Sequence, residues 1–140
     1  QPSLDSPTLT SLCGFGSKNQ ITTGTNNGGT IHAISAETGK TVWKYEQRAA
    51  TQSLVATGGR LLFGGDAQGR FRAFDQDTGK VLWEVNLGSQ VTGYPISYSV
   101  GGKQYIAVST GGSLATGGTM ALTPELRSGT ANNLFVFALP

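Results

Sequence analysis

The sequence predicts an all-β fold made of repeated antiparallel strands, and three observations indicate this class. An eleven-residue pattern occurs twice, at residues 33–43 and 73–83. Runs of β-branched and aromatic residues alternate with short turns that contain glycine. The chain also holds 21 glycines among its 140 residues, as expected for a fold with many tight turns.

The two copies of the pattern share Ala, Thr, Gly, Lys and Trp at identical positions. They read Ala33-Ile-Ser-Ala-Glu-Thr-Gly-Lys-Thr-Val-Trp43 and Ala73-Phe-Asp-Gln-Asp-Thr-Gly-Lys-Val-Leu-Trp83, and they contain both tryptophans of the chain. A period of about 40 residues with a glycine and a tryptophan in each copy is typical of β-propellers, in which each repeat forms one blade of four strands. The sequence therefore predicts two clear blades and part of a third.

The chain is too short to close a ring of blades by itself. A propeller of four or more blades needs about 160 residues, and the chain has 140. We therefore expect a fragment, one part of a processed protein, or a subunit that completes its ring with a partner. Residues 1–28 are expected to form a loop-rich segment with one short strand, and residues 29–140 to hold the blades and a closing strand.

Alternating apolar and polar residues locate the expected strands. They lie at 31–34 and 41–45 in the first repeat, at 54–56, 61–64, 70–74 and 81–85 in the second, and at 94–98, 104–108 and 134–138 in the remainder. Gly58-Gly59 and Gly101-Gly102 are expected to be two-residue hairpin turns. Residues 46–52 are expected to form a loop between blades, and 120–127 to hold a helical turn. The last strand is expected to complete a blade begun elsewhere in the protein.

The two tryptophans are expected to hold neighbouring blades together. An indole ring can lie flat on a peptide only where that residue has no side chain, and Gly39 and Gly79 meet this condition. The indole N–H needs a backbone acceptor, which we expect near the start of a neighbouring repeat, at Ala33 or Ala73. Burial of one such ring contributes about 3 kcal/mol. A structural role is therefore expected for both tryptophans.

The composition excludes several classes of protein. Ten basic and eight acidic residues give a net charge of +2, which is too small and too dispersed for a nucleic-acid-binding surface. The chain has no run of 18 apolar residues, so no membrane span is predicted. Cys13 is the only cysteine, which excludes an internal disulfide and a thiolate metal cluster. Cys13 is interpreted either as a small loop residue or as the partner of a cysteine elsewhere.

Several segments besides the repeat resemble one family. The repeat is similar to the tryptophan-docking motif of the quinoprotein dehydrogenases, which use pyrroloquinoline quinone (PQQ) and a calcium or lanthanide ion. Further segments resemble the same family and, with the repeat, cover well over half of the chain: Leu54-Val-Ala-Thr-Gly-Gly59 and its continuation to Gly69, Gly93-Tyr-Pro-Ile-Ser-Tyr98, Gly102-Lys-Gln-Tyr-Ile-Ala-Val108 and Asn133-Leu-Phe-Val-Phe-Ala-Leu-Pro140.

The resemblance implies an eight-bladed β-propeller, of which this chain would form about two to three blades at the C-terminal end. It implies a periplasmic PQQ-dependent alcohol dehydrogenase that oxidises an alcohol or aldehyde by hydride transfer to PQQ and passes electrons to a cytochrome c. The family's base, metal ligands and vicinal cysteines are expected upstream, so no catalytic or metal-binding residue is assigned here, and the chain alone is expected to be inactive. The alternative is a non-catalytic propeller of the same repeat type that acts in assembly or ligand sensing.

Two segments are expected to approach the cofactor, and we call them the rim residues. They are Thr51, Gln52 and Ser53, where many family members carry Trp-Gly-Gly, and Gly111, Gly112 and Ser113, which follow the 104–108 strand. The alternative interpretation is a flexible loop between blades. Other polar residues are expected to have structural roles, with Glu37, Asp66, Asp75 and Asp77 in turns and His32 on a solvated strand face.

Overall fold

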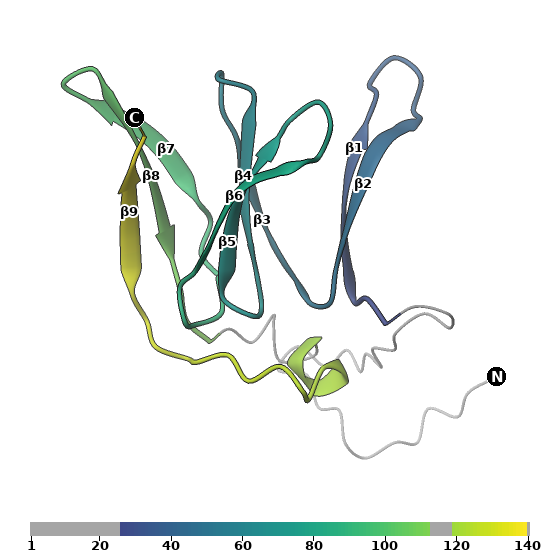
Figure 1. Ribbon diagram of the computed structural model, residues 1–140, viewed down its shortest axis with the longest axis vertical. Helices are drawn as coiled ribbons and strands as arrows, with labels where there is room; N and C mark the ends of the chain where they lie inside the picture. Colours follow the sequence, from purple (N-terminus) through teal and green to yellow (C-terminus); the bar gives the residue numbers. More distant parts are fainter. Residues whose placement is uncertain (1–25, 113–118, 140) are drawn as a thin grey trace, which may run out of the picture.

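The computed structural model describes residues 26–112 and 119–139, which form three antiparallel sheets standing side by side (Figure 1). The first sheet pairs β1 (Gly29–Ile34) with β2 (Thr41–Gln47). The second has the order β3 (Ala50–Ala56), β4 (Leu61–Asp66), β5 (Arg70–Asp75) and β6 (Val81–Asn86). The third has the order β7 (Ile96–Val100), β8 (Lys103–Ser109) and β9 (Leu134–Ala138). The all-β fold is confirmed.

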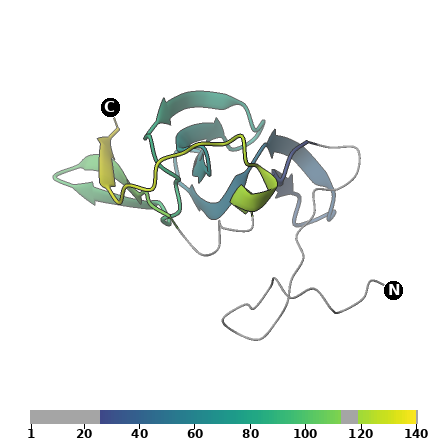
Figure 2. The same ribbon diagram turned by 90° about the horizontal axis from the view of Figure 1, so that it is seen from below.

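The two ends of the sheets carry different kinds of loop. The loops inside the β1–β2, β3–β4, β5–β6 and β7–β8 hairpins lie at one end, which we call the hairpin end (Figure 1). The connections that follow β2, β4, β6 and β8 lie at the opposite end, the connection end. Figure 2 shows residues 119–133, which begin with a helical turn at 119–122, running across the connection end from the first sheet towards the third.

The two copies of the repeat occupy equivalent places in the first two sheets. Ala33 pairs with Trp43, and Ala73 pairs with Trp83, with an irregularity in the register directly after each alanine. Gly39 and Gly79 have φ angles of 67° and 70°, so each glycine takes the left-handed position of its turn. Each copy therefore forms an antiparallel strand pair closed by the same turn.

The main core lies between the second and third sheets. Phe63, Phe71, Ile106 and Val108 are at most 2% exposed and belong to one cluster with Val91. Full burial of one such side chain contributes about 1.5–3 kcal/mol. The second sheet is also covered on its other face, where Phe74 meets Tyr45 of the first sheet edge to face, with ring centroids 4.9 Å apart.

Three expectations about loops and strand limits are corrected. The loop expected at 46–52 is short, because β2 continues to Gln47 and β3 begins at Ala50. The strand expected at 94–98 lies at Ile96–Val100, because Pro95 has no N–H to donate to a ladder. Gly58-Gly59 is part of a four-residue loop in which Arg60, with a φ of 62°, takes the left-handed position.

Two further expectations concern the third sheet. Gly101-Gly102 is a two-residue hairpin turn as predicted, since Val100 pairs with Lys103 and both glycines have positive φ. The last strand was expected to complete a blade begun elsewhere, but β9 pairs with β8 of the same chain. The expected loop and strand at 1–25 and the position of Cys13 lie outside the described residues.

Candidate functional site

The structure places the described rim residues at the connection end. Thr51, Gln52 and Ser53 belong to the first half of β3, and Gly111 and Gly112 follow the end of β8 (Figure 1). The first three are therefore strand residues and do not form a loop. Ser113 lies outside the described residues.

The connection between β6 and β7 links the two groups of rim residues. The Oγ of Ser53 donates to the carbonyl of Gly93 at 2.8 Å, and the N–H of Gly93 donates to the carbonyl of Ser109 at 3.1 Å. The Oγ1 of Thr92 donates to the carbonyl of Gly111 at 3.0 Å. Thr92 and Gly93 were not predicted to take part in the rim, and they are the residues that bring the two segments together.

Gly111 is held where only glycine fits. Its φ is 148°, and a Cβ at this position would overlap the Oδ1 of Asn132. Its N–H donates to the carbonyl of Gln90 at 2.9 Å, while the N–H of Thr110 donates to the carbonyl of Asn133 at 2.9 Å. The residues after the helical turn therefore pack directly against this part of the rim, which presents backbone to its surroundings.

The described rim residues offer no charge. Ser53 is 3% exposed and its hydroxyl is already bonded, Gly111 is buried, and Gly112 is exposed. Within residues 26–112 and 119–139, no group of three or more His, Cys, Asp or Glu side chains is placed to hold a metal ion. This part of the rim can act as a wall but supplies no proton acceptor.

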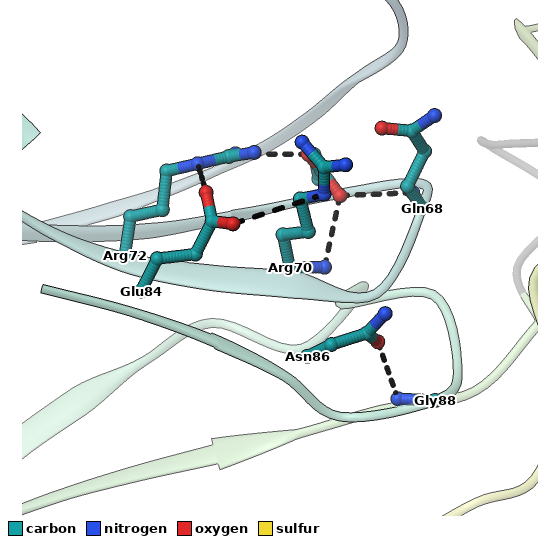
Figure 3. A network of polar contacts seen from close by, with 7 residues as sticks. Gln68, Arg70, Arg72, Glu84, Asn86 and Gly88 are labelled. Carbon is teal, nitrogen blue, oxygen red and sulfur yellow. Dashed lines mark hydrogen bonds and ion pairs between the residues drawn. The ribbon is translucent and has the colours of Figure 1, made fainter.

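A buried ion pair fixes the turn between β4 and β5 beside the rim (Figure 3). The Oδ1 of Asp66 accepts the backbone N–H groups of Gln68 and Arg70 at 2.9 and 3.0 Å, which confirms the predicted turn. Its Oδ2 accepts from the Nη1 of Arg72 at 2.8 Å, and both side chains are 3% exposed. The Nε of Arg72 donates to Glu84 at 2.6 Å. No pattern in the sequence predicted this buried pair.

Arg72 and Asp66 link the β4–β5 turn to the first sheet and to the connection between β6 and β7. Burial by itself would lower the pKa of Arg72, but the carboxylates of Asp66 and Glu84 outweigh it and raise that pKa above its usual value. The guanidinium also lies over the Tyr45 ring of the first sheet, 5.7 Å from its centroid. The carbonyl of Asp66 accepts the N–H of Val91, which directly precedes Thr92.

Trp43 docks on the second sheet at the hairpin end, away from the rim. A Cβ on Gly79 would lie 2.5 Å from the indole, so the ring lies against that glycine as predicted. Its Nε1 donates to the carbonyl of Gln76 at 2.9 Å. The acceptor expected at Ala73 is therefore three residues further along, within the turn that also contains Gly79.

Trp83 meets a different surface. Its ring packs edge to face against Phe137 of β9 and Phe71, with centroids 5.2 and 6.2 Å away. No residue in the described part of the chain accepts a hydrogen bond from its N–H. The ring is 40% exposed and borders an apolar groove of about 530 Å³, to which Leu82, Phe63 and Leu139 also contribute.

The remaining polar residues lie in the places expected from the sequence. The Oδ1 of Asp75 accepts from the backbone N–H and the Oγ1 of Thr78, and Asp77 forms an ion pair with Arg60. Glu37 lies exposed in the equivalent turn of the first repeat. His32 is exposed on β1, beside Thr30.

Arg48 is a further polar residue that the sequence did not indicate. Its guanidinium donates to the Oε1 of Glu125 at 2.6 Å and to the carbonyls of Leu122 and Asn26. The hydrogen bond from Arg48 lowers the pKa of Glu125. Arg48 thereby ties the helical turn to the end of β2. The neighbouring Gln47 is 6% exposed, and its Oε1 has no partner among the described residues.

The geometry defines a stretch of β-propeller with tryptophan contacts at one end and a backbone-lined edge at the other. A family profile for the β-propeller domain of glucose, ethanol and alcohol dehydrogenases that use PQQ matches residues 47–106. Quinoprotein alcohol dehydrogenase PedE of Pseudomonas putida is 38% identical over 117 residues, which cover 80% of this chain and 18% of that protein. Subunit 1 of methanol dehydrogenase (cytochrome c) of Methylobacterium organophilum is 40% identical over 84 residues, which cover 59% of this chain and 13% of that protein.

Two solved structures of dehydrogenases are also similar to this chain. A europium-containing methanol dehydrogenase superposes with a TM-score of 0.71 at 31% identity, covering 83% of this chain and 24% of that one. Quinohemoprotein alcohol dehydrogenase ADHIIG of Pseudomonas putida HK5 gives a TM-score of 0.66 at 27% identity, covering 78% and 16%. The chain belongs to the β-propeller family of the quinoprotein alcohol dehydrogenases. It spans less than a fifth of the length of the curated relatives named above.

Proposed function

We propose that the chain is the C-terminal part of a quinoprotein dehydrogenase that oxidises an alcohol or aldehyde with PQQ. The observation that carries this proposal is the 38% identity to a quinoprotein alcohol dehydrogenase, extending over 80% of the chain. PQQ, when bound, supplies the acceptor for a hydride from the substrate. A periplasmic location and a cytochrome c as the next electron acceptor are parts of the same proposal.

The rim residues fit a wall of the cofactor site. Gly111 and Gly93 allow close backbone approaches at the connection end, and the hydroxyls of Ser53 and Thr92 hold this backbone in place. Such a wall can orient a planar group and exclude water from one side of it. Because it carries no charge, it cannot pair with the cofactor's carboxylates.

The charged part of the site therefore has to come from other blades. We propose that the ligands of a calcium or lanthanide ion and the catalytic base lie in the polypeptide upstream of this chain. Within the described residues, none of the helices is long and apolar enough to cross a membrane.

The direct test uses the full-length polypeptide loaded with PQQ and either calcium or a lanthanide. We expect it to reduce an artificial electron acceptor when a panel of alcohols and aldehydes is supplied. A protein that binds PQQ without turnover on any substrate would contradict the enzymatic proposal and favour a ligand-sensing propeller. Failure to bind PQQ at all would favour an assembly role.

A further inference from the structure

The buried pair of Asp66 and Arg72 joins more elements than the turn that it closes. The carboxylate of Asp66 bonds the turn and Arg72, while the backbone carbonyl of Asp66 accepts the N–H of Val91 at 3.1 Å. Arg72 also reaches Glu84 on β6 (Figure 3) and lies over the ring of Tyr45 on β2. Three strands of the second sheet, the first sheet and the β6–β7 connection therefore meet at one ion pair.

Stability alone does not account for two charges at this position. Both side chains are 3% exposed, and the cost of removing two charges from water offsets much of their mutual attraction. A neutral pair of similar volume is often as stable in such a place. A charge-assisted pair adds a defined geometry, because its N–H groups and oxygens have to align. The pair is thus suited to hold in place the segments that are bonded to it.

The β6–β7 connection, which is bonded to the Asp66 carbonyl, also joins the two groups of rim residues. Its Thr92 donates from Oγ1 to the carbonyl of Gly111 at 3.0 Å. Its Gly93 accepts from the Oγ of Ser53 at 2.8 Å. A shift of the Asp66 carbonyl would therefore reach both parts of the rim within a few residues.

The β4–β5 turn contacts the same connection at a second place. The carbonyl of Gly69 accepts the N–H of Leu87 at 2.7 Å. A Cβ on Gly69 would lie 2.7 Å from the carbonyl oxygen of Ser89, so the two backbones touch without a side chain between them. The turn and the connection thus pack as one unit, which the ion pair anchors to β5.

We propose that Asp66 and Arg72 are positioning residues for the wall of the cofactor site, an inference that rests on the proposed function. The pair fixes the β6–β7 connection and, through it, holds the backbone of Gly93 and Gly111 against one side of PQQ. Both side chains are too deeply buried to touch the cofactor themselves, so each acts through the backbone.

A double substitution in the full-length polypeptide separates position from stability. Asp66→Asn combined with Arg72→Met, the neutral variant, removes both buried charges and keeps a side-chain oxygen for the turn. Its melting temperature should stay within about 5 °C of the native value, because Glu84 is 41% exposed and no unpaired charge stays buried. Asp77→Asn combined with Arg60→Met is the matched control, since it makes the same two changes in an exposed ion pair at the hairpin end.

Hydrogen exchange in the quinone-free protein measures the positioning directly. We expect the N–H groups of Gly93 and Gly111, both hydrogen-bonded to backbone carbonyls, to exchange at least about threefold faster in the neutral variant. The N–H of Gly79, at the hairpin end of the same sheet, should keep its native rate. The dissociation constant of PQQ should rise about tenfold in the neutral variant and less than about twofold in the control.

Native exchange rates at Gly93 and Gly111 in the neutral variant would overturn the proposal. Faster exchange with an unchanged dissociation constant would also overturn it, because the pair would then position backbone that does not hold the cofactor. A native protein that binds no PQQ would contradict the proposed function instead. The exchange rates would then still decide whether the pair positions the rim.

A second variant applies if the neutral variant does not fold. Arg72→Lys keeps the buried charge but loses the planar fork that bonds both Asp66 and Glu84. We expect faster exchange at Gly93 and Gly111 and a native rate at the hairpin end. Native rates at both glycines, or equal acceleration at both ends of the sheet, would overturn the proposal.

Discussion

Trp43 and Trp83 occupy the same position of the same repeat, yet they meet different surfaces. Trp43 lies on Gly79 and donates its N–H to the carbonyl of Gln76. Trp83 packs edge to face on Phe137, and no described residue accepts its N–H. The difference comes from the neighbouring sheet. The second sheet presents a Thr-Gly-Lys turn to the first, whereas the third presents the aromatic strand β9 to the second.

Neighbouring sheets of this chain are joined in two different ways. Between the first two sheets, one ring is fixed by a backbone acceptor and by a glycine that leaves room for it. Between the second and third sheets, a larger apolar core does the same work, with Phe63, Phe71 and Ile106 nearly fully buried. A repeated motif therefore defines the position of a side chain but not its partner. The following substitutions, made in the full-length protein, test this distinction.

The largest effect is expected from removing the two rings. Trp43→Ala should destabilise the protein by about 3–5 kcal/mol, because it empties a packed site and leaves the Gln76 carbonyl without its donor. Trp83→Ala should cost about 1–2 kcal/mol less, since its ring is 40% exposed and makes no described hydrogen bond. Denaturant unfolding of both variants gives the comparison. Equal losses would show that the Gln76 and Gly79 contacts add nothing.

The next largest effect is expected from filling the space above Gly79, where the indole of Trp43 lies. Gly79→Ala and Gly39→Ala each place a side chain at a φ near 70°, so both share the strain of the left-handed conformation. Only at position 79 would the new Cβ meet an indole, while at Gly39 nothing lies within 4 Å in this chain. We expect Gly79→Ala to be more destabilising by about 1–3 kcal/mol. Thermal unfolding of both variants measures the difference. A larger loss for Gly39→Ala would mean that another element covers that turn in the whole protein.

A smaller effect is expected from removing only the hydrogen bond between Trp43 and the carbonyl of Gln76. Trp43→Phe keeps an aromatic ring but removes the donor to Gln76, at an expected cost about 1 kcal/mol larger than that of Trp83→Phe. The free energies of unfolding of the two phenylalanine variants provide the measurement. If Trp83→Phe costs as much, its N–H has an acceptor in the whole protein, and the contrast between the two sites is narrower than the described residues indicate.

The smallest effect is expected from Asp75, the carboxylate in the turn that also contains Gly79. Hydrogen bonds from the Oγ1 and N–H of Thr78 lower the pKa of Asp75 below its ordinary value of 3.8. A lowered carboxyl pKa stabilises the folded state above pH 4 or so, and this contribution is lost as the pH falls through the folded pKa. The melting temperature of Asp75→Asn should therefore lie below that of the native protein at pH 6, and the gap should narrow towards pH 3. A gap that is constant or widens on acidification would contradict this role.

Local signals in the sequence were enough to predict most of the sheet structure. The alternation of residues, the Thr-Gly-Lys turns and the Gly101-Gly102 hairpin depend on a few adjacent residues each, and the structure has them where they were expected. A strand was expected from the aromatic Tyr94 onwards, but β7 begins at Ile96, because Pro95 has no N–H to donate to the ladder. The partner of β9 depends on packing between distant segments, which the pattern of one strand cannot reveal.

The candidate site was predicted only in outline. Ser53 and Gly111 lie at the same end of the sheets, but the link between them uses the carbonyl of Gly93 and the hydroxyl of Thr92. The sequence alone does not show which distant groups such a carbonyl or hydroxyl meets. The same reason explains why the Gln76 carbonyl was missed as the acceptor for Trp43. The buried Asp66–Arg72 pair was missed because charged residues are usually read as exposed.

Equilibrium binding of PQQ to the full-length polypeptide tests the central claim most directly. Gel filtration in the presence of calcium or a lanthanide, followed by absorbance of the protein peak, would measure the quinone retained per protein. The quinoprotein account predicts one PQQ per polypeptide. It also predicts weaker retention when Gly112→Trp fills the exposed position of the rim, without a change in melting temperature of the quinone-free protein. Absence of retained PQQ from a folded, metal-loaded protein would contradict the account.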